Sequence, residues 1–365
     1  MSADFPLYRV LTPFAWLYGG VIALRNRLFD WGVLPSEHFL LPVICIGNLA
    51  VGGTGKTPHV EYLIRLLSQR YRVAVLSRGY KRRTKGFRLA DVHDTSETIG
   101  DEPFQLKTKF PWLCVAVSED RRVGIRQLMA LPEGQRPELL LLDDAYQHRY
   151  VTPSFSILLT DSHRLYTRDA LLPVGRLRES AAGAKRADVV IVTKCEPLPT
   201  EADRETICKE LALREGQALC FSEIRYGDLC PLFPKEAQPR TLASLAEEEV
   251  LLWTGIAHPE PLERLLQQQA KRLTAMAFSD HHAFTEADMR RIDTAYQQLS
   301  TSAKLMIVTE KDAARLCTCS LLPPAWKASL YYLPITVGFS TADEQRFNQL
   351  VEQHVTLFSN ERKAE

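Results

Sequence analysis

Short runs of apolar residues recur along the first half of the chain, separated by segments with helical periodicity. The runs are continuous rather than alternating: VICIG (43–47), VAVL (73–76), LCVAV (113–117), ELLLL (138–142), FSILLT (155–160) and DVVIVT (188–193). Strands of this kind are buried on both faces, which is typical of a parallel sheet flanked by helices. The pattern therefore predicts an α/β fold built on a parallel sheet.

A polar stretch with several prolines, from about residue 227 to residue 249, interrupts this rhythm. After it the apolar runs resume as VLLWTG, LTAMAF, KLMIVT and SLYYLPI. A chain of 365 residues also exceeds the usual size of one compact core. The sequence predicts three parts: an N-terminal helical segment (1–38), a P-loop domain (39–226) and a smaller C-terminal α/β domain (227–365).

The N-terminal segment carries an uncharged run, LTPFAWLYGGVIAL, from residue 11 to residue 24. The run is shorter than the roughly 20 residues that span a bilayer, and no small-residue cleavage site follows it. Aromatic residues cluster around it together with Arg25 and Arg27, which is typical of a helix in a membrane interface. We expect a membrane-associating helix here, although a helix packed on its own domain gives the same pattern.

The composition limits the classes of partner. Lys and Arg number 45 against 44 Asp and Glu, so the net charge of +1 offers no global basic field for a nucleic acid backbone. The eight cysteines are scattered without a C-x-x-C pair, which favours a reducing compartment and argues against a zinc site. We expect no nucleic acid partner, and any anionic ligand must be held locally.

The stretch AVGGTGKT, residues 50–57, lies between the run VICIG and the amphipathic segment PHVEYLIRLL. It follows the phosphate-loop pattern G-x-x-x-x-G-K-[ST], with alanine in place of the first glycine. In such a loop the backbone N–H groups bind phosphates, the lysine reaches the terminal phosphates and the hydroxyl binds Mg²⁺. The predicted nucleotide-binding residues are Ala50, Val51, Gly52, Gly53, Thr54, Gly55, Lys56 and Thr57.

Two acids end a neighbouring strand. The run ELLLL passes directly into Asp143 and Asp144. Because the carboxyl ends of parallel strands meet at one edge of a sheet, we expect these carboxylates beside the phosphate loop, where one of them can hold Mg²⁺ through water.

Two further clusters of acidic and histidine residues suit a general base that acts on an acceptor hydroxyl. Asp101 and Glu102 follow a glycine at the start of a helix in TIGDEPFQL, and Asp280, His281 and His282 follow the run LTAMAF. A carboxylate paired with an imidazole can take the proton of an acceptor hydroxyl near neutral pH. Each cluster also has an ordinary explanation, because Asp is common near a helix start and most histidines are structural.

Taken together and in this order, the motifs resemble those of the bacterial tetraacyldisaccharide 4′-kinases, and the resemblance covers nearly the whole chain. It rests on GNLAVGGTGKTP, LSRGYKRRTKG, GDEP, SEDRRVG, LLLDDAYQHR, LLPVGRLRES, ADVVIVTK, TGIAHPE, FSDHHAFT and IVTEKDAARL. Two departures are mild: Ala145-Tyr146 stand where Gly-Phe is usual, and Ser180 replaces a common proline. These differences affect local turns rather than the chemistry.

The resemblance implies a kinase of lipid A biosynthesis. The family transfers the γ-phosphate of ATP to the 4′-hydroxyl of an acylated glucosamine disaccharide 1-phosphate, with Mg²⁺, and the product is lipid IVA. The implied location is the cytoplasmic face of the bacterial inner membrane, with the protein peripheral or monotopic.

The resemblance also implies roles for individual residues. Asp101 of GDEP and His281 of DHH form the base pair, while His282 is not the expected partner. The other implied catalytic residues, around the phosphates, are Lys56, Arg121 and Arg178. The implied metal side comprises Thr57, Glu102, Asp143, Asp144 and Glu179.

Two other classes remain open from the sequence. VTKCE (192–196) is similar to the guanine-reading [NT]-K-x-D loop of a P-loop GTPase or ATPase switch or a metallochaperone-like protein, but Glu196 stands where aspartate is required. Val51 also stands where the dimerising partitioning ATPases carry a lysine. A non-catalytic ATP-binding membrane adaptor is the other alternative, and it would need no acceptor base.

Overall fold

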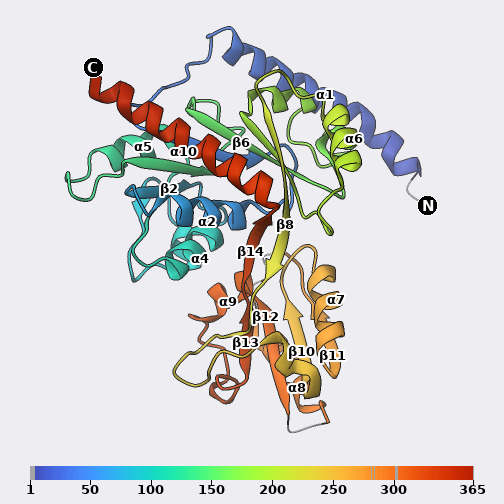
Figure 1. Ribbon diagram of the computed structural model, residues 1–365. Helices are drawn as coiled ribbons and strands as arrows, with labels where there is room; N and C mark the ends of the chain where they lie inside the picture. The colour runs from blue at the N-terminus through green and yellow to red at the C-terminus, as the bar shows by residue number, and fades with distance from the viewer. Residues whose placement is uncertain (1–4, 281, 283, 301–302, 365) are drawn as a thin grey trace.

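The computed structural model describes residues 5–280, 282, 284–300 and 303–364. Within these residues the chain forms two lobes (Figure 1): a large lobe on a nine-stranded sheet and a small lobe on a five-stranded sheet. The strand order is β14-β8-β7-β6-β1-β5-β2-β4-β3 in the large sheet and β11-β10-β12-β13-β9 in the small one. The predicted α/β architecture with a second, smaller α/β part is confirmed.

The parallel core of the large sheet occupies the apolar runs expected from the sequence. Its strands are β1 (Val43–Asn48), β2 (Val73–Ser77), β4 (Cys114–Val117), β5 (Leu139–Asp143), β6 (Phe155–Asp161) and β7 (Val189–Thr193). β1 lies between β5 and β6, and all three run parallel. The loop after β1 and the acids at the end of β5 therefore emerge side by side at one edge of the sheet.

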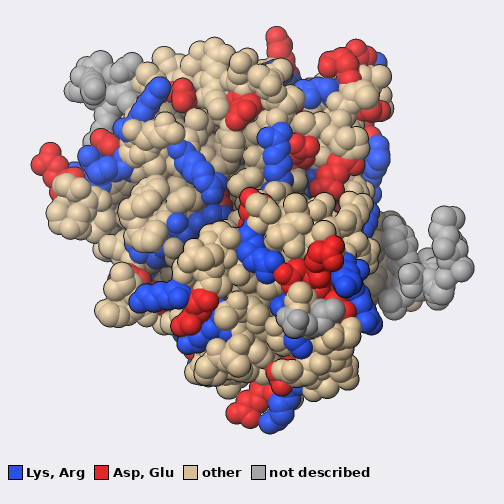
Figure 2. All heavy atoms as spheres, turned by 60° about the horizontal axis from the view of Figure 1, so that its bottom comes forward, with Lys and Arg blue, Asp and Glu red and all other residues tan. Residues whose placement is uncertain are grey.

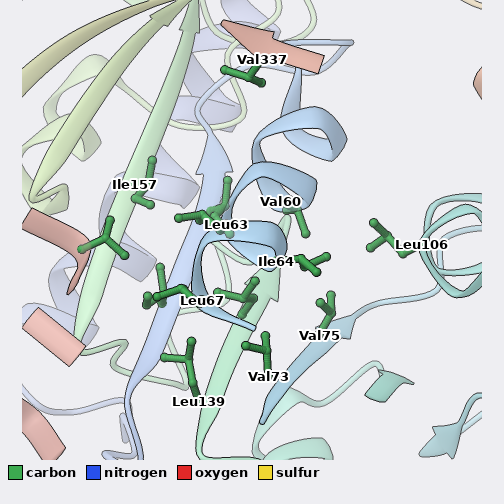
Figure 3. Close-up of a cluster of buried hydrophobic side chains, with 14 of the residues drawn as sticks. Val60, Leu63, Ile64, Leu67, Val73, Val75, Leu106, Leu139, Ile157 and Val337 are labelled. Atoms are coloured by element: carbon green, nitrogen blue, oxygen red, sulfur yellow. The ribbon is translucent and has the colours of Figure 1, made fainter. Parts of the chain in front are cut away.

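Helix α2 (Lys56–Leu67) shows how packing fixes that edge. Its apolar residues recur at helical spacing, and Figure 3 shows Val60, Leu63, Ile64 and Leu67 directed at the strands of the large sheet. Each is almost fully buried, and burial of one such side chain contributes about 1.5–3 kcal/mol. The start of α2, and with it the phosphate loop, is thereby held in a fixed place on the sheet.

Further elements of the large lobe extend or flank this parallel core. They are β3 (Arg88–Leu89), α3 (Ser96–Ile99), α4 (Asp101–Lys109), α5 (Arg121–Met129), α6 (Glu201–Leu211) and β8 (Ala218–Tyr226). Acidic and basic side chains are interspersed on the face shown in Figure 2, in keeping with the nearly balanced composition.

The small lobe has its own sheet and core. Its elements are β9 (Cys230–Pro231), β10 (Glu249–Thr254), α7 (Glu260–Gln269), β11 (Arg272–Ala277), α8 (Glu286–Gln297), β12 (Lys304–Thr309), α9 (Glu310–Leu316) and β13 (Leu330–Leu333). Strands β11, β10, β12 and β13 pair in parallel. Trp253 and Trp326 pack edge to face in the centre of one core layer.

The C-terminal boundary differs from the predicted domain at 227–365. Strand β14 (Ile335–Phe339) pairs antiparallel with β8 in the large sheet, and α10 (Thr341–Ala364) buries Phe347, Val351 and Val355 in the large-lobe core. Figure 1 shows this return, with β14 beside β8 and α10 across the large lobe. The run SLYYLPI is split at Pro334, which lacks a backbone N–H for a continuous ladder. The small lobe therefore ends near residue 334.

Helix α1 (Phe5–Asp30) packs on the large lobe with one face and leaves the other open. The Tyr18 hydroxyl donates to the Arg178 carbonyl at 2.7 Å, and Asn26 Nδ2 donates to Glu179 at 3.0 Å. The open face exposes Phe14, Trp16, Leu17, Val21 and Leu24. Among the described residues, no helix combines the length and apolarity needed to cross a membrane.

Candidate active site

The phosphate loop connects β1 to α2 at the carboxyl edge of the large sheet. Gly52 and Gly55 have φ values of 111° and 83°, which L side chains rarely adopt, so the loop needs glycine at both positions. Gly55 is the N-cap of α2, and the first backbone N–H groups of a helix have no intrahelical partner. Asn48 Nδ2 donates to Thr54 Oγ1 at 2.8 Å and fixes the loop from β1. The loop is thus built as an anion cradle at a helix N-terminus.

A second loop, around Leu177, supports the other side of the phosphate loop. Ala50 pairs antiparallel with Leu177, and the backbone N–H of Val51 donates to the carbonyl of Arg176 at 2.8 Å. This pairing places the Arg178 guanidinium beside the acids, where Nη2 donates to Asp144 Oδ1 at 2.8 Å. The motif GRLRE (175–179) therefore supports the phosphate loop through backbone pairing.

The predicted convergence of lysine, arginine and acids is present. Asp143 lies opposite Ile46 in the β5–β1 pairing, and Lys56 Nζ lies 3.8 Å from Asp144 Oδ2. Burial raises the pKa of Asp144, but the charges of Lys56 and Arg178 outweigh it and hold that pKa below its ordinary value. Asp144 is therefore kept ionised by the two cations that are expected to bind phosphate.

The pKa of Asp143 is shifted in the opposite direction to that of Asp144. Burial, followed by the nearby charges of Glu102 and Asp144, raises the pKa of Asp143 to about 8. Its Oδ1 is buried and receives no hydrogen bond from any residue that the structure describes. A buried carboxylate that lacks a donor and lies among other acids is a good site for a cation.

The donor set fits Mg²⁺. Asp144 and Thr57 line the cleft, the buried Asp143 directly precedes Asp144, and all three offer hard oxygen ligands. Mg²⁺ commonly uses one or two carboxylates plus substrate phosphates. Within the described part of the chain, no group of three or more His, Cys, Asp or Glu forms a cage for a metal. The residues present thus suit an ion that arrives with a nucleotide.

Replacing Asp143 by asparagine is expected to raise the melting temperature of the metal-free protein, and to do so more at pH 8 than at pH 5. The folded pKa of about 8 lies above the ordinary 3.8, so the contribution of Asp143 to stability is complete below pH 3.8 and is lost as the pH rises to about 8. Thermal melts from pH 5 to pH 9 measure this difference. Added Mg²⁺ should stabilise the wild type more at pH 8 than at pH 5, and a pH-independent difference between the two proteins would contradict the assignment.

Arg121 and Glu102 border the same acids. Arg121 is the first residue of α5 and is buried, with Nη1 donating to the carbonyls of Ser118 and Glu119 at 3.3 and 3.2 Å. Burial lowers the pKa of Arg121 to about 10, and the charge of Asp143 opposes that shift. Both Arg121 and Glu102 line the cleft, as the resemblance implies.

Glu179, which the resemblance places on the metal side, is surrounded by hydrogen-bond donors in the structure. Glu179 is buried, and Arg186 Nη2 donates to both of its oxygens at 2.8 and 2.9 Å. Asn26 of α1 and Gln147 also donate to this carboxylate, each at 3.0 Å. Because four hydrogen bonds already engage its oxygens, we assign Glu179 to the frame that joins α1 to the site rather than to the metal.

Asp101 begins α4 and faces the small lobe. Arg315 Nη2 of α9 donates to Asp101 Oδ2 at 2.7 Å. His281 lies outside the described residues, so the Asp101–His281 pair stays a prediction. On either side of it in sequence, Asp280 accepts from Lys311 Nζ at 3.0 Å, and His282 Nε2 lies 2.9 Å from Asp288 Oδ2.

A cleft of about 960 Å³ runs between the lobes, and residues of both lobes line it. The large lobe lines it with the phosphate loop and Asp144, and the small lobe contributes the loop after β10, Asp280 and Lys311. The sequence did not indicate a role at the site for Lys194, His258, Lys311 or Arg315, and it placed Arg25 only in the membrane-associating helix. The motif IVTEKDAARL was the available signal for Lys311 and Arg315.

Comparison with known proteins agrees with the geometry. The family model described as Tetraacyldisaccharide-1-P 4′-kinase matches residues 7–356. A tetraacyldisaccharide 4′-kinase of Parabacteroides distasonis is 56% identical over 348 residues, which cover 95% of this chain and 94% of that protein. Another from Bacteroides fragilis is 49% identical over 352 residues, covering 96% and 93%.

A solved structure is also similar to this chain over almost its full length. The crystal structure of LpxK from Aquifex aeolicus in complex with ATP aligns with a TM-score of 0.73 at 29% identity, over 96% of this chain and 99% of that chain. The resemblance found in the motifs thus extends to sequence and fold over almost the full length. The chain belongs to the tetraacyldisaccharide-1-phosphate 4′-kinase family.

Proposed function

We propose that the protein transfers the γ-phosphate of ATP to the 4′-hydroxyl of a tetraacyldisaccharide 1-phosphate, giving lipid IVA. The observation that carries this proposal is the meeting of the phosphate loop, Asp144 and Arg178 in one cleft between the two lobes. Phosphoryl transfer depends mainly on positioning and on charge stabilisation, and these residues provide both.

The described residues divide this work. The loop amides and Lys56 hold the phosphates, with Arg121 and Arg178 beside them. Mg²⁺, when bound, neutralises charge that develops on the transferring phosphate. In the structure Lys56 and Arg178 form ion pairs with Asp144. Phosphates that attract these two cations would free Asp144 for the metal, so nucleotide and metal binding should support each other.

The acceptor base is assigned to Asp101 together with His281. Asp101 belongs to the large lobe, and His281 stands in the sequence between Asp280 and His282, which the structure places in the small lobe. We therefore expect the pair to form only where the lobes meet. Such a division suppresses ATP hydrolysis in the absence of the acceptor, because closure assembles the site around both substrates.

Acceptor dependence tests the proposed function. ADP release by the purified protein is measured in detergent with ATP and Mg²⁺, with and without tetraacyldisaccharide 1-phosphate. We expect slow release without the lipid and an increase on the order of tenfold or more with it, and GTP should replace ATP poorly. Equal rates with and without lipid would indicate an ATPase switch, and ATP binding without any ADP release would indicate an adaptor.

We further propose that the open face of α1 lies on the cytoplasmic face of the inner membrane. An acylated acceptor keeps its chains in the bilayer, so its kinase must work at the surface. The exposed Phe14, Trp16 and Leu17 suit an interface, and Arg25 follows them. The same helix contacts the site, because Arg25 donates to the carbonyl of Gln147 at 3.2 Å and lines the cleft.

Replacing both Trp16 and Leu17 by glutamate is expected to move most of the protein from the membrane fraction to the soluble fraction. Both side chains are more than two thirds exposed, at 76% and 69%, so the fold should tolerate the change. Fractionation and thermal melts measure the two effects. Trp112→Glu is the matched control, since Trp112 is also exposed but lies outside α1. Continued membrane binding of the double variant would place the anchor elsewhere.

A further inference from the structure

Two basic residues on one face of α9 form ion pairs with acidic residues of the two lobes. Arg315 donates to Asp101 of α4 at 2.7 Å, and Lys311 donates to Asp280 at 3.0 Å. Lys311 and Arg315 are four residues apart, a spacing that puts two side chains on the same face of a helix. Asp280 directly precedes His281 in the chain. The short helix α9 therefore forms ion pairs with both segments to which the acceptor base is assigned.

Arg315 is itself held in place from within the small lobe. Its Nη1 donates to Asp312 Oδ1 at 3.3 Å, so the guanidinium spans two carboxylates. The other oxygen of Asp312 accepts from the backbone N–H of Gly255 at 3.0 Å and from Thr309 Oγ1 at 2.6 Å. Asp312 is fully buried. The contact with Asp101 thus continues into the rigid ends of β10 and β12.

A second ion pair joins the same two helices at the other end of α4. Lys109 lies 2.6 Å from Glu61 of α2 and also pairs with Glu310 of α9. Glu61 is buried and follows the phosphate loop on α2. α4 is therefore attached to α9 near both of its ends, and it links the small lobe to the helix that carries Lys56.

We propose that Arg315 is a positioning residue for the phosphoryl transfer, which sets the place and orientation of the Asp101 carboxylate across the lobe junction. Lys311 does the same for the segment of Asp280. The inference rests on the proposed function. Among the described residues, Lys311 lines the cleft, while Arg315 and Asp101 both lie behind its lining. Because the Arg315 guanidinium donates to the carboxylates of Asp101 and Asp312, Arg315 acts through Asp101 rather than on a substrate.

Kinetics of Arg315 variants test this role. In Arg315→Gln we expect kcat to fall on the order of tenfold or more, because small misplacements of a reacting group are costly, while KM for ATP and for the lipid stays within about threefold. Arg315→Lys should recover part of the rate, since an ammonium can bond Asp101 but cannot span both carboxylates as the fork does.

A distant Arg–Asp pair provides the matched control. Arg204 of α6 donates to both oxygens of Asp343 at 2.8 and 2.6 Å within the large lobe. Arg204→Gln removes a bidentate pair of the same chemistry without touching the lobe junction. It should lower the melting temperature and leave kcat of the folded protein unchanged.

The decisive comparison uses Asp101→Asn, measured in single turnovers with γ-labelled ATP and tetraacyldisaccharide 1-phosphate. If Arg315 acts through Asp101, the double variant Arg315→Gln/Asp101→Asn is no slower than Asp101→Asn alone. Multiplying effects, or a normal kcat in Arg315→Gln beside an inactive Asp101→Asn, would overturn the inference and leave the proposed function standing. A wild-type protein that labels no lipid would overturn the proposed function and the inference with it.

Discussion

Replacing Lys56 by alanine is expected to lower the turnover number by about two orders of magnitude or more and to leave the fold intact. Lys56 is the first residue of α2, and its Nζ extends into the cleft towards Asp144. A cation at this place stabilises charge on the transferring phosphate in a partly desolvated site, where loss of one such group commonly costs that much. Buried residues further along α2 keep the helix in place without it.

Steady-state kinetics with the lipid acceptor, together with thermal melts, measure the two parts of this prediction. Arg65→Ala is the control, because Arg65 is a cation of the same helix that pairs with Glu61 and is 43% exposed in its side chain. That variant should keep its turnover. An unchanged rate in Lys56→Ala would remove the phosphate loop from the mechanism.

Replacing Asp101 by asparagine is expected to lower turnover by about 10²-fold or more with little change in ATP affinity. The amide keeps the shape of the side chain but cannot serve in a general base, a contribution that is typically worth 10²–10⁴-fold. ATP affinity should persist because Asp101 lies on α4, at the junction with α9, and not in the phosphate loop.

Turnover with the lipid acceptor and equilibrium binding of ATP separate these effects. Glu97→Gln serves as the control, since Glu97 is an exposed acid of α3 that pairs with Arg83. Near-normal turnover in Asp101→Asn would show that the acceptor base is elsewhere. An Asp101→Asn protein that no longer binds ATP would show that the residue supports the nucleotide site instead.

The parallel core could be predicted because its strands are continuous apolar runs, and burial on both faces leaves little choice of structure. Strand β14 could not be assigned in the same way. Its five residues follow Pro334 directly after a strand of the small sheet, and their partner β8 lies more than a hundred residues earlier. Such pairing depends on contacts far apart in the sequence, which local pattern does not encode.

Some residues of the candidate site could likewise be predicted from local sequence, and others could not. The phosphate loop and the acids after β5 follow from local sequence, because strand ends at one sheet edge must converge. Glu179 was expected beside the metal because it adjoins Arg178 in the sequence, but adjacency within a bent segment does not fix where a side chain points. Arg178 turns to Asp144 while Glu179 turns to Arg186. Arg315 escaped notice because its contact with Asp101 joins residues 214 positions apart.

Transfer of label to the acceptor tests the central claim most directly. Purified protein is incubated in detergent with γ-labelled ATP, Mg²⁺ and tetraacyldisaccharide 1-phosphate, and the position of the label on the lipid is determined. We predict a bis-phosphorylated lipid with the new phosphate on the 4′ oxygen, absent when Lys56→Ala replaces the wild type. Label recovered only as inorganic phosphate, or on a different oxygen of the lipid, would contradict the account.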